Sequence, residues 1–239
     1  MALLQQIPSE FKEYLVSFLV HTHPTDKDNL YHNIFHSFEV LELVTHILKH
    51  VDTFDKWEIL VQVAALFHDL DPERQPNTPP SVARTLHYLE HNSDANSIIR
   101  FLCDLFGFNP QQVNTLILAT DYSENPEERK RKWDLFCQEC LIHFKEVNTA
   151  ILLGRILAYA DKAATQILLP VNVTAQRIKG LAFELRTLNN SQHPTDTEMW
   201  AGTSSFITSE LIDNDMFHYL PVNYRRRLEQ NRIFFTEFI

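Results

Sequence analysis

The sequence predicts an all-α protein that folds as a single compact domain of roughly ten helices. Only four of its 239 residues are Gly, whereas a fold rich in tight β-turns needs residues at positive φ. Apolar residues recur at helical spacing along most of the chain. Most of the eleven Pro lie at or between the ends of these periodic segments, where Pro interrupts helices. No segment of the sequence has a convincing strand pattern.

The apolar periodicity places the helices in order along the chain. The first helix begins at Ser9, and the Ser9 side chain is expected to cap it. Residues 56–70 are nearly all apolar, as in a central buried helix, and residues 71–80 form a loop because they contain four Pro. The expected helices span about 9–21, 30–52, 56–70, 81–91, 94–106, 110–122, 127–146, 147–168, 173–190, 197–212 and 223–236.

The composition narrows the classes of function. Acidic residues outnumber basic ones by 31 to 21, which gives a net charge of −10, and such a surface repels duplex nucleic acid. A small phosphate ligand remains compatible, because a bound cation outweighs the overall field locally. Three Cys are too few for a disulfide framework. With no apolar run near the ~20 residues of a membrane span and no signal-peptide pattern, we expect a cytoplasmic protein without membrane contact.

Four short fragments carry ionisable residues in apolar surroundings: Tyr31-His32-Asn33-x-x-His36, His68-Asp69-Leu70-Asp71, Ala119-Thr120-Asp121 and Ala160-Asp161. His32 and His36 are four residues apart on an expected helix, so both should project from one face. His68 and Asp69 end one apolar helix, and Asp161 lies inside another. Such groups are costly to bury unless they are paired or bind a metal. Two imidazoles and two carboxylates suit Zn²⁺, Mn²⁺ or Fe²⁺, and such a site polarises a phosphoryl oxygen.

The order of these fragments resembles the HD-domain superfamily of metal-dependent phosphohydrolases, and the motifs are most similar to those of class I cyclic-nucleotide phosphodiesterases. Their Tyr-His-Asn-x-x-His-x-x-Asp-Val motif is similar to residues 31–40, with Glu39 in place of Asp. Their His-Asp-Val-Asp-His-Pro-Gly-x-x-Asn segment is similar to residues 68–77. Their Ala-Thr-Asp and Ala-Asp fragments are similar to residues 119–121 and 160–161. The resemblance covers about residues 31–165.

The resemblance implies a role for each matching residue. The divalent metal would be held by His36, His68, Asp69 and Asp161. Asp69 would also bridge to a second metal or its waters, and His32 would be the general acid that protonates the leaving oxygen, so these two are the expected catalytic residues. The ions would be one or two of Zn, Mn, Mg, Fe or Co. Further candidates, for positions behind the ligands or at the substrate, are Asp71, Asn77, Asp121 and Lys162.

The chain departs from the phosphodiesterase pattern at two positions and in its length. Pro72 occupies the place of the second His in the His-Asp-x-x-His segment. The chain reads Tyr-Ser-Glu-Asn at 122–125, where a His commonly follows Ala-Thr-Asp. It is also shorter than a full phosphodiesterase catalytic domain. These differences leave the second metal and the identity of the substrate open.

The expected function is hydrolysis of a small nucleotide by a metal-activated water, with a 3′,5′-cyclic nucleotide phosphodiester as the favoured substrate. The alternatives are a nucleotide phosphomonoesterase and a nucleotide- and metal-binding module with weak catalysis. A di-iron oxygenase is least favoured, because it needs more ligands than these fragments supply. We expect one domain over residues 1–239, with a metal-site core at about 30–168 and helices of 171–239 packed on it. A homodimer stays open.

Some other residues have both a structural and a functional interpretation. His87 and His91 share a helix face, which is expected to meet solvent rather than metal. The Cys137-x-x-Cys140-x-x-His143 pattern is one ligand short of a zinc site, so core packing is favoured. Arg155 and Lys162 lie near Asp161 on one helix. They could meet a substrate phosphate or form ordinary salt bridges.

Overall fold

The computed structural model describes residues 2–23, 31–51, 55–74, 79–123, 125–189 and 194–237. These residues form twelve α-helices and no strand, which confirms the predicted all-α class. The helices are α1 (Ala2–Gln6), α2 (Ser9–Thr22), α3 (Ile34–Leu48), α4 (Asp55–Phe67), α5 (Val82–His91), α6 (Ser93–Phe106), α7 (Pro110–Leu118), α8 (Pro126–His143), α9 (Val147–Leu168), α10 (Val171–Asn189), α11 (Asp196–Phe206) and α12 (Val222–Thr236). A π-helix, η1 (Ile207–Ile212), continues α11, and a 3₁₀ helix, η2 (Asp215–Tyr219), follows it.

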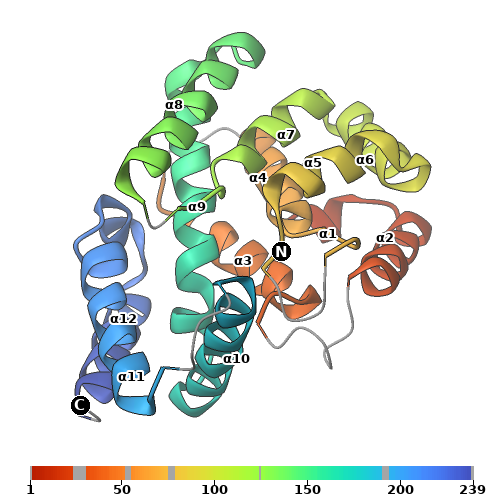
Figure 1. Cartoon of the computed structure of the whole chain (residues 1–239). Coiled ribbons are helices and arrows are strands. Elements are labelled where there is room, and N and C mark those ends of the chain that lie inside the picture. Colours follow the sequence, from red (N-terminus) through yellow and green to blue (C-terminus); the bar gives the residue numbers. More distant parts are fainter. Residues whose placement is uncertain are drawn as a thin grey trace.

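The long helix α9 forms the centre of the molecule (Figure 1). It packs against α3, α4, α7 and α8 on one side of the molecule and against α10 and α12 from the C-terminal part of the chain. Helix α3 also packs along α4, so α3, α4 and α9 form a mutually packed group. This group carries most of the fully buried apolar side chains of the core. A charged side chain inside it is therefore costly unless it is paired or bound to a ligand.

A glycine sets the spacing between α8 and α9. A Cβ atom added to Gly154 on α9 would lie 2.2 Å from Cζ of Phe136 on α8, and the Phe136 side chain is fully buried. The aromatic ring therefore occupies the space that any larger residue at position 154 would need. This close approach brings α8 alongside the part of α9 that leads to Asp161.

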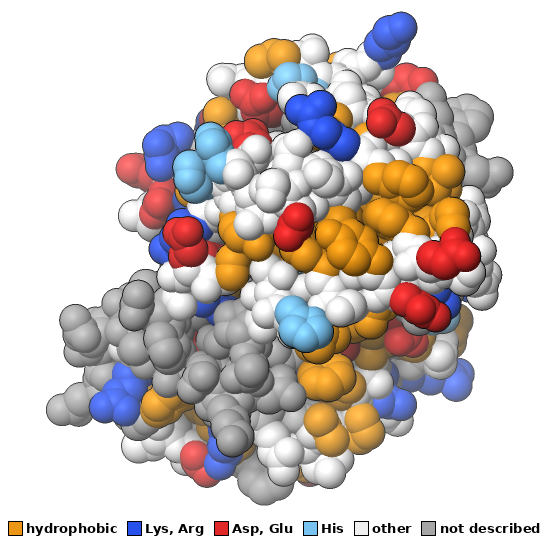
Figure 2. Space-filling view, turned by 90° about the vertical axis from the view of Figure 1, so that its right-hand side faces the viewer, with side chains coloured by type: hydrophobic (Ala, Val, Ile, Leu, Met, Phe, Trp, Pro, Cys, Tyr) orange, Lys and Arg blue, Asp and Glu red, His pale blue; other side chains and the backbone are white. Residues whose placement is uncertain are grey.

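One face of the molecule is partly apolar. Figure 2 shows this face, on which hydrophobic side chains gather among acidic ones. Helices α2 and α6 contribute to it, because Phe11 stacks on Phe101 with ring centroids 4.1 Å apart and Tyr14 and Leu105 remain exposed. In the part of the chain that is described, no helix combines the length and apolarity that crossing a membrane requires.

Several helix ends differ from the prediction. Helix α3 begins at Ile34 rather than near residue 30, because the Asn33 side chain accepts hydrogen bonds from the backbone N–H groups of Phe35 and His36 and caps it. His32 therefore precedes the helix, and the expectation that it shares a helix face with His36 is wrong. Pro8, not Ser9, is the N-cap of α2.

Two of the motifs lie in turns rather than in helices. Helix α4 ends at Phe67, so His68 and Asp69 belong to the turn that follows it. Helix α7 ends at Leu118 rather than near Tyr122, and residues 119–121 lie just beyond it. The apolar pattern placed these ends too late, because Leu70 and Tyr122 continue the run of apolar residues past the last helical turn.

Candidate metal centre

Three elements bring four predicted ligands to one point. His36 lies in the first turn of α3, His68 and Asp69 follow α4, and Asp161 lies on α9. Both imidazole side chains are fully buried, whereas the Asp161 side chain retains 21% exposure. Because α3, α4 and α9 are mutually packed, residues more than a hundred positions apart in the sequence meet inside the fold.

The four side chains direct their donor atoms at one another. His36 Nε2 lies 3.0 Å from Oδ1 of Asp161 and 3.8 Å from Oδ2 of Asp69. His68 Nε2 lies 3.2 Å and 3.3 Å from the same two oxygens. One donor atom from each residue lies within 4.8 Å of all the others. This spacing and the mixed nitrogen and oxygen chemistry match the preferences of a divalent transition metal.

The outer nitrogens of both imidazoles face oxygen atoms, but only that of His68 makes a hydrogen bond. His68 Nδ1 donates to the carbonyl oxygen of Ala65 at 2.8 Å, which leaves Nε2 to act as a ligand. His36 Nδ1 faces Oε2 of Glu39 at 3.9 Å. Glu39 in turn accepts a hydrogen bond from the Thr165 hydroxyl at 2.9 Å. These contacts orient both rings from behind, as is typical of metal-binding His residues.

The electrostatics of the cluster suit a divalent cation. Burial disfavours charge on His36, but the carboxylates of Asp161 and Glu39 raise its pKa to about 9. The two imidazoles in turn hold the pKa of Asp161 far below its ordinary value, although burial alone would raise it. Oδ2 of Asp69 is buried and makes no hydrogen bond. A divalent cation would take the place of the protons on the imidazoles and give this oxygen a partner, so the residues present fit a metal.

His32 lies beside the cluster and has a partner that the sequence did not reveal. Its ring centroid is 5.6 Å from that of His36. Its Nδ1 donates to Oε2 of Glu184 on α10 at 2.6 Å, and Oε1 of Glu184 accepts the backbone N–H of Tyr31 at 2.9 Å. Burial alone would raise the pKa of Glu184, but the bond from His32 lowers it overall. The available signal was an acidic residue within the apolar run 181–185.

A buried arginine also contacts this histidine. Arg74 is 6% exposed, and its Nη2 donates to the backbone carbonyl of His32. Burial lowers the pKa of Arg74, although Glu184 and Asp69 lie near enough to oppose this effect. Arg74 thus fixes the bend that carries His32. Neither Arg74 nor Glu184 was among the predicted site residues.

The remaining candidates lie outside the cluster. Asp71 is buried, but it accepts hydrogen bonds from Arg84 at 2.7 Å and from the backbone of Ser81 at 2.8 Å, and so anchors the loop between α4 and α5. Asp121 accepts a hydrogen bond from Lys132 at 2.7 Å, and Lys162 donates to Glu210 at 2.8 Å. Asn77 lies outside the residues that the structure describes.

The histidine pair on α5 and the Cys-x-x-Cys-x-x-His pattern on α8 make structural contacts. The His87 and His91 rings stack with centroids 4.1 Å apart, and His143 pairs with Glu139 at 3.1 Å. Cys140 is buried in the core. Over the described ranges, the four residues around Asp161 are the one group of three or more His, Cys, Asp or Glu side chains with metal spacing.

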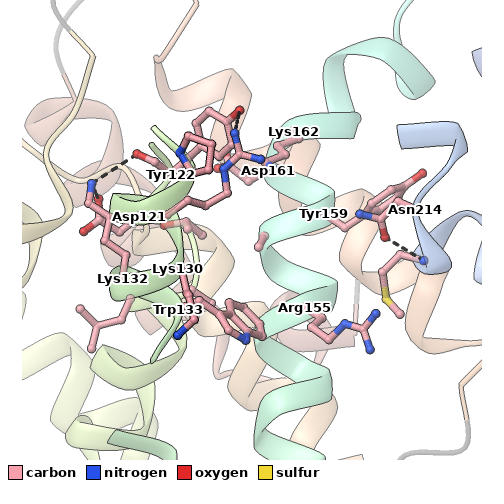
Figure 3. A pocket seen from close by; sticks show the side chains of 17 residues that line it. Asp121, Tyr122, Lys130, Lys132, Trp133, Arg155, Tyr159, Asp161, Lys162 and Asn214 are labelled. Atoms are coloured by element: carbon pink, nitrogen blue, oxygen red, sulfur yellow. Dashed lines mark hydrogen bonds and ion pairs between the residues drawn. The ribbon is translucent and has the colours of Figure 1, made fainter. Parts of the chain in front are cut away.

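A pocket of about 420 Å³ opens next to Asp161, between α8 and α9 (Figure 3). Its wall includes Asp121 and Tyr122 from the segment between α7 and α8, and Lys162 from α9. Asp161 belongs both to this wall and to the metal cluster. A molecule that occupies the pocket therefore reaches the cluster.

Comparison with known proteins relates the fold to a phosphodiesterase domain. No family model matches the sequence, and no curated protein matches it. Among solved structures, the phosphodiesterase domain of Salpingoeca rosetta rhodopsin phosphodiesterase is similar, with a TM-score of 0.59 and 15% sequence identity. The match covers 95% of this chain and 79% of the other. This likeness shows an all-α, phosphodiesterase-like fold.

Proposed function

We propose that this protein is an HD-type, metal-dependent phosphohydrolase that cleaves a phosphodiester bond in a small nucleotide, with a 3′,5′-cyclic nucleotide as the first substrate to test. The observation that carries the proposal is the convergence of two imidazoles and two carboxylates within 4.8 Å, next to the paired side chain of His32. The likeness of the fold to a phosphodiesterase domain supports the same class of reaction.

The four ligands would hold the metal through Nε2 of His36, Nε2 of His68 and the carboxylates of Asp69 and Asp161. A divalent cation at this point supplies Lewis-acid chemistry, since it polarises a phosphoryl oxygen and lowers the pKa of water. The pocket beside Asp161 gives a substrate access to the centre. The metal is one of Zn, Mn, Mg, Fe or Co in this proposal.

His32 is suited to deliver a proton to the leaving oxygen. Because its Nδ1 donates to Glu184, its Nε2 is the nitrogen left to hold and release a proton. Its side chain is 15% exposed, so a substrate can reach it. The Glu184 carboxylate stabilises the charged imidazole and fixes its orientation. A ribose 3′-oxygen is a poor leaving group without a proton, which favours a sugar phosphodiester as the substrate.

One observation favours a second candidate function. Within the described residues the structure contains a single four-donor cluster, and Pro72 stands where a His would assist a second metal in the resembling family. A centre with one firmly held metal also suits a nucleotide phosphomonoesterase. A nucleotide-binding module that turns over slowly is the remaining alternative.

Product analysis separates these functions. The protein is incubated with cyclic AMP, cyclic GMP and nucleoside monophosphates in the presence of Mn²⁺, Mg²⁺, Co²⁺ or Zn²⁺, and the products are separated by chromatography. Conversion of a cyclic nucleotide to its 5′-monophosphate supports the proposal. Phosphate release from monophosphates alone would make the protein a nucleotidase, and metal binding without turnover would make it a binding module. Asp161→Asn, which removes one ligand charge, is the control for contaminating activity.

A further inference from the structure

Basic side chains outnumber carboxylates among the residues that line the pocket beside Asp161, and each of these basic side chains lies within ion-pair distance of a carboxylate. Five basic side chains are among the described residues that line it: Arg129, Lys130, Lys132, Arg155 and Lys162. Two carboxylates, Asp121 and Asp161, also line the pocket, and Asp161 is a proposed metal ligand. The chain as a whole carries a net charge of −10. A cluster of cations against this background favours an anionic ligand.

The end of the pocket near the metal centre is tightly organised. Lys162 Nζ and Arg129 Nη1 both donate to Glu210, at 2.8 Å and 3.1 Å. Both cations also lie over the Tyr122 ring, 4.3 Å and 4.6 Å from its centroid. These contacts join α8, α9 and η1 around one aromatic ring. Two cations share the Glu210 carboxylate, so this carboxylate balances only one of their two positive charges.

The far end of the pocket has a cation that is held loosely. Arg155 precedes Asp161 by six residues on α9, which places it about 9 Å further along the helix axis. It donates to Asp215 at 2.9 Å, but the two side chains are 41% and 80% exposed. Exposed ion pairs contribute little free energy, so a phosphate group can replace Asp215 at small cost. Trp133 lies at this same end (Figure 3), where its ring offers a surface for a nucleoside.

We infer that the pocket selects nucleotides with a second phosphate, placed one nucleoside away from the phosphate that binds at the metal centre, and that Arg155 binds this second phosphate. The inference rests on the proposed phosphodiesterase function and narrows its substrate. A cyclic mononucleotide has one phosphate and leaves Arg155 paired with Asp215. A terminally phosphorylated dinucleotide supplies both a scissile phosphodiester and the second charge.

The reaction on such a dinucleotide is a simple hydrolysis. The oxygen of one water molecule forms a bond to phosphorus, and the bond between phosphorus and the ribose 3′-oxygen breaks. His32 gives a proton to that 3′-oxygen. The attacking water loses a proton, which returns through solvent to His32. The dinucleotide pApA gives two molecules of 5′-AMP, and ApAp gives adenosine and adenosine 3′,5′-bisphosphate; no oxidant or reductant takes part.

Binding measurements test the inference without turnover. The full chain, loaded with Mn²⁺, is titrated calorimetrically with adenosine 3′,5′-bisphosphate, 5′-AMP and 3′-AMP. We expect the bisphosphate to bind about two- to fivefold more tightly than the better monophosphate, as for one exposed charge pair. Arg155→Ala should bring this ratio close to one. Asp215→Asn, which removes the competing carboxylate, should increase it.

Arg232→Ala is the matched control. Arg232 is also an arginine paired with an acid, Glu229 at 3.1 Å, and its exposure of 39% is close to that of Arg155. It lies on α12, away from the pocket, so the bisphosphate ratio should not change. A ratio near one in the unaltered protein, or an equal loss in the Arg155 and Arg232 variants, would overturn the inference.

Turnover distinguishes failure of this inference from failure of the proposed function. The dinucleotide ApA is compared with its terminally phosphorylated forms pApA and ApAp, and bis(4-nitrophenyl) phosphate reports hydrolysis at the metal centre. Cleavage of all diesters with equal KM would overturn the second-phosphate site and leave the phosphodiesterase in place. A bisphosphate preference with no cleavage of any diester would overturn the enzyme and retain the site. A KM that is lower for one phosphorylated dinucleotide than for ApA, and that rises in the Arg155→Ala variant, supports both the phosphodiesterase and the second-phosphate site.

Discussion

The two regions that meet at Asp161 are built in opposite ways. In the metal cluster the His36 and His68 side chains are fully buried, and backbone or carboxylate contacts fix their rings. In the neighbouring pocket, the Arg155 pair at the far end is largely exposed. Buried ionisable groups have a strict requirement for a partner, whereas exposed pairs exchange partners easily. Under the proposed function, the buried cluster would carry out the chemistry and the exposed pocket would select the substrate.

The largest effect is expected from removing a ligand of the buried cluster. Asp69→Ala should abolish both metal binding and hydrolysis, because it removes a carboxylate that faces both imidazoles. Metal content measured by elemental analysis and turnover of bis(4-nitrophenyl) phosphate check this together. A variant with full metal occupancy and a near-normal rate would remove Asp69 from the site.

His32→Ala should lower the rate and leave the metal in place. General acid catalysis contributes about 10²–10⁴-fold, so a loss of this size is expected for sugar phosphodiesters, whose leaving oxygen needs a proton. The loss should be much smaller for nitrophenyl esters, which have good leaving groups. Rates on both substrate types and metal content make the comparison. An equal loss on both types would assign a structural role to His32.

The sequence predicted the metal cluster better than the pocket, for a physical reason. His36, His68, Asp69 and Asp161 stand out because their charge interrupts apolar helices, and that contrast is visible in one dimension. Glu184 is also an acidic residue in an apolar run, but that run is only five residues long. Its contact with His32 spans 152 positions in the sequence. The helix caps were missed for a related reason, since the role of Asn33 depends on its backbone geometry.

The pocket could not be predicted from the sequence because its charges look like ordinary surface charges. Arg155 and Lys162 were left between two interpretations, and the structure shows that both form salt bridges. The convergence of basic side chains from α8 and α9 on one cavity depends on how these two helices pack against each other. That packing in turn depends on the contact between Gly154 and Phe136, which lie 18 positions apart in the sequence.

Glu184→Gln should lower turnover by about tenfold, less than the loss of His32 itself, because the imidazole stays but loses its charged partner. It should also change the pH dependence of stability. The pKa of Glu184 is lowered in the folded protein, so its carboxylate stabilises the fold above its unfolded pKa, and this contribution is lost as the pH falls through the folded pKa. Urea unfolding of both proteins at neutral and acid pH measures this. A difference in stability that stays constant with pH would contradict it.

Gly154→Ala tests the packing that shapes the pocket. The added Cβ would collide with the buried Phe136 ring, and overpacking of this kind costs about 1–3 kcal/mol of unfolding free energy. Gly202→Ala on α11 is the matched control, because its Cβ would meet nothing within 4 Å. Alanine there should stabilise the helix by about 0.5–1 kcal/mol. Thermal unfolding of both variants decides the matter, and equal shifts would contradict the proposed close contact.

The smallest signal is expected with duplex nucleic acid. The acidic net charge opposes binding to phosphate backbones, and the cationic pocket has the volume of a small-molecule site, about 420 Å³. Fluorescence anisotropy with labelled duplexes at physiological salt should therefore show no tight binding. A submicromolar, sequence-independent affinity would mean that the pocket is part of a wider nucleic-acid surface.

The most direct test of the metal centre couples binding to turnover. Chelator-treated protein is titrated with Mn²⁺ while metal binding and hydrolysis of bis(4-nitrophenyl) phosphate are followed in parallel. The cluster of His36, His68, Asp69 and Asp161 predicts that activity rises in step with the first equivalent bound, and that Asp161→Ala loses both. Hydrolysis by the metal-free protein, or an Asp161→Ala variant that binds one equivalent and keeps a normal rate, would contradict it.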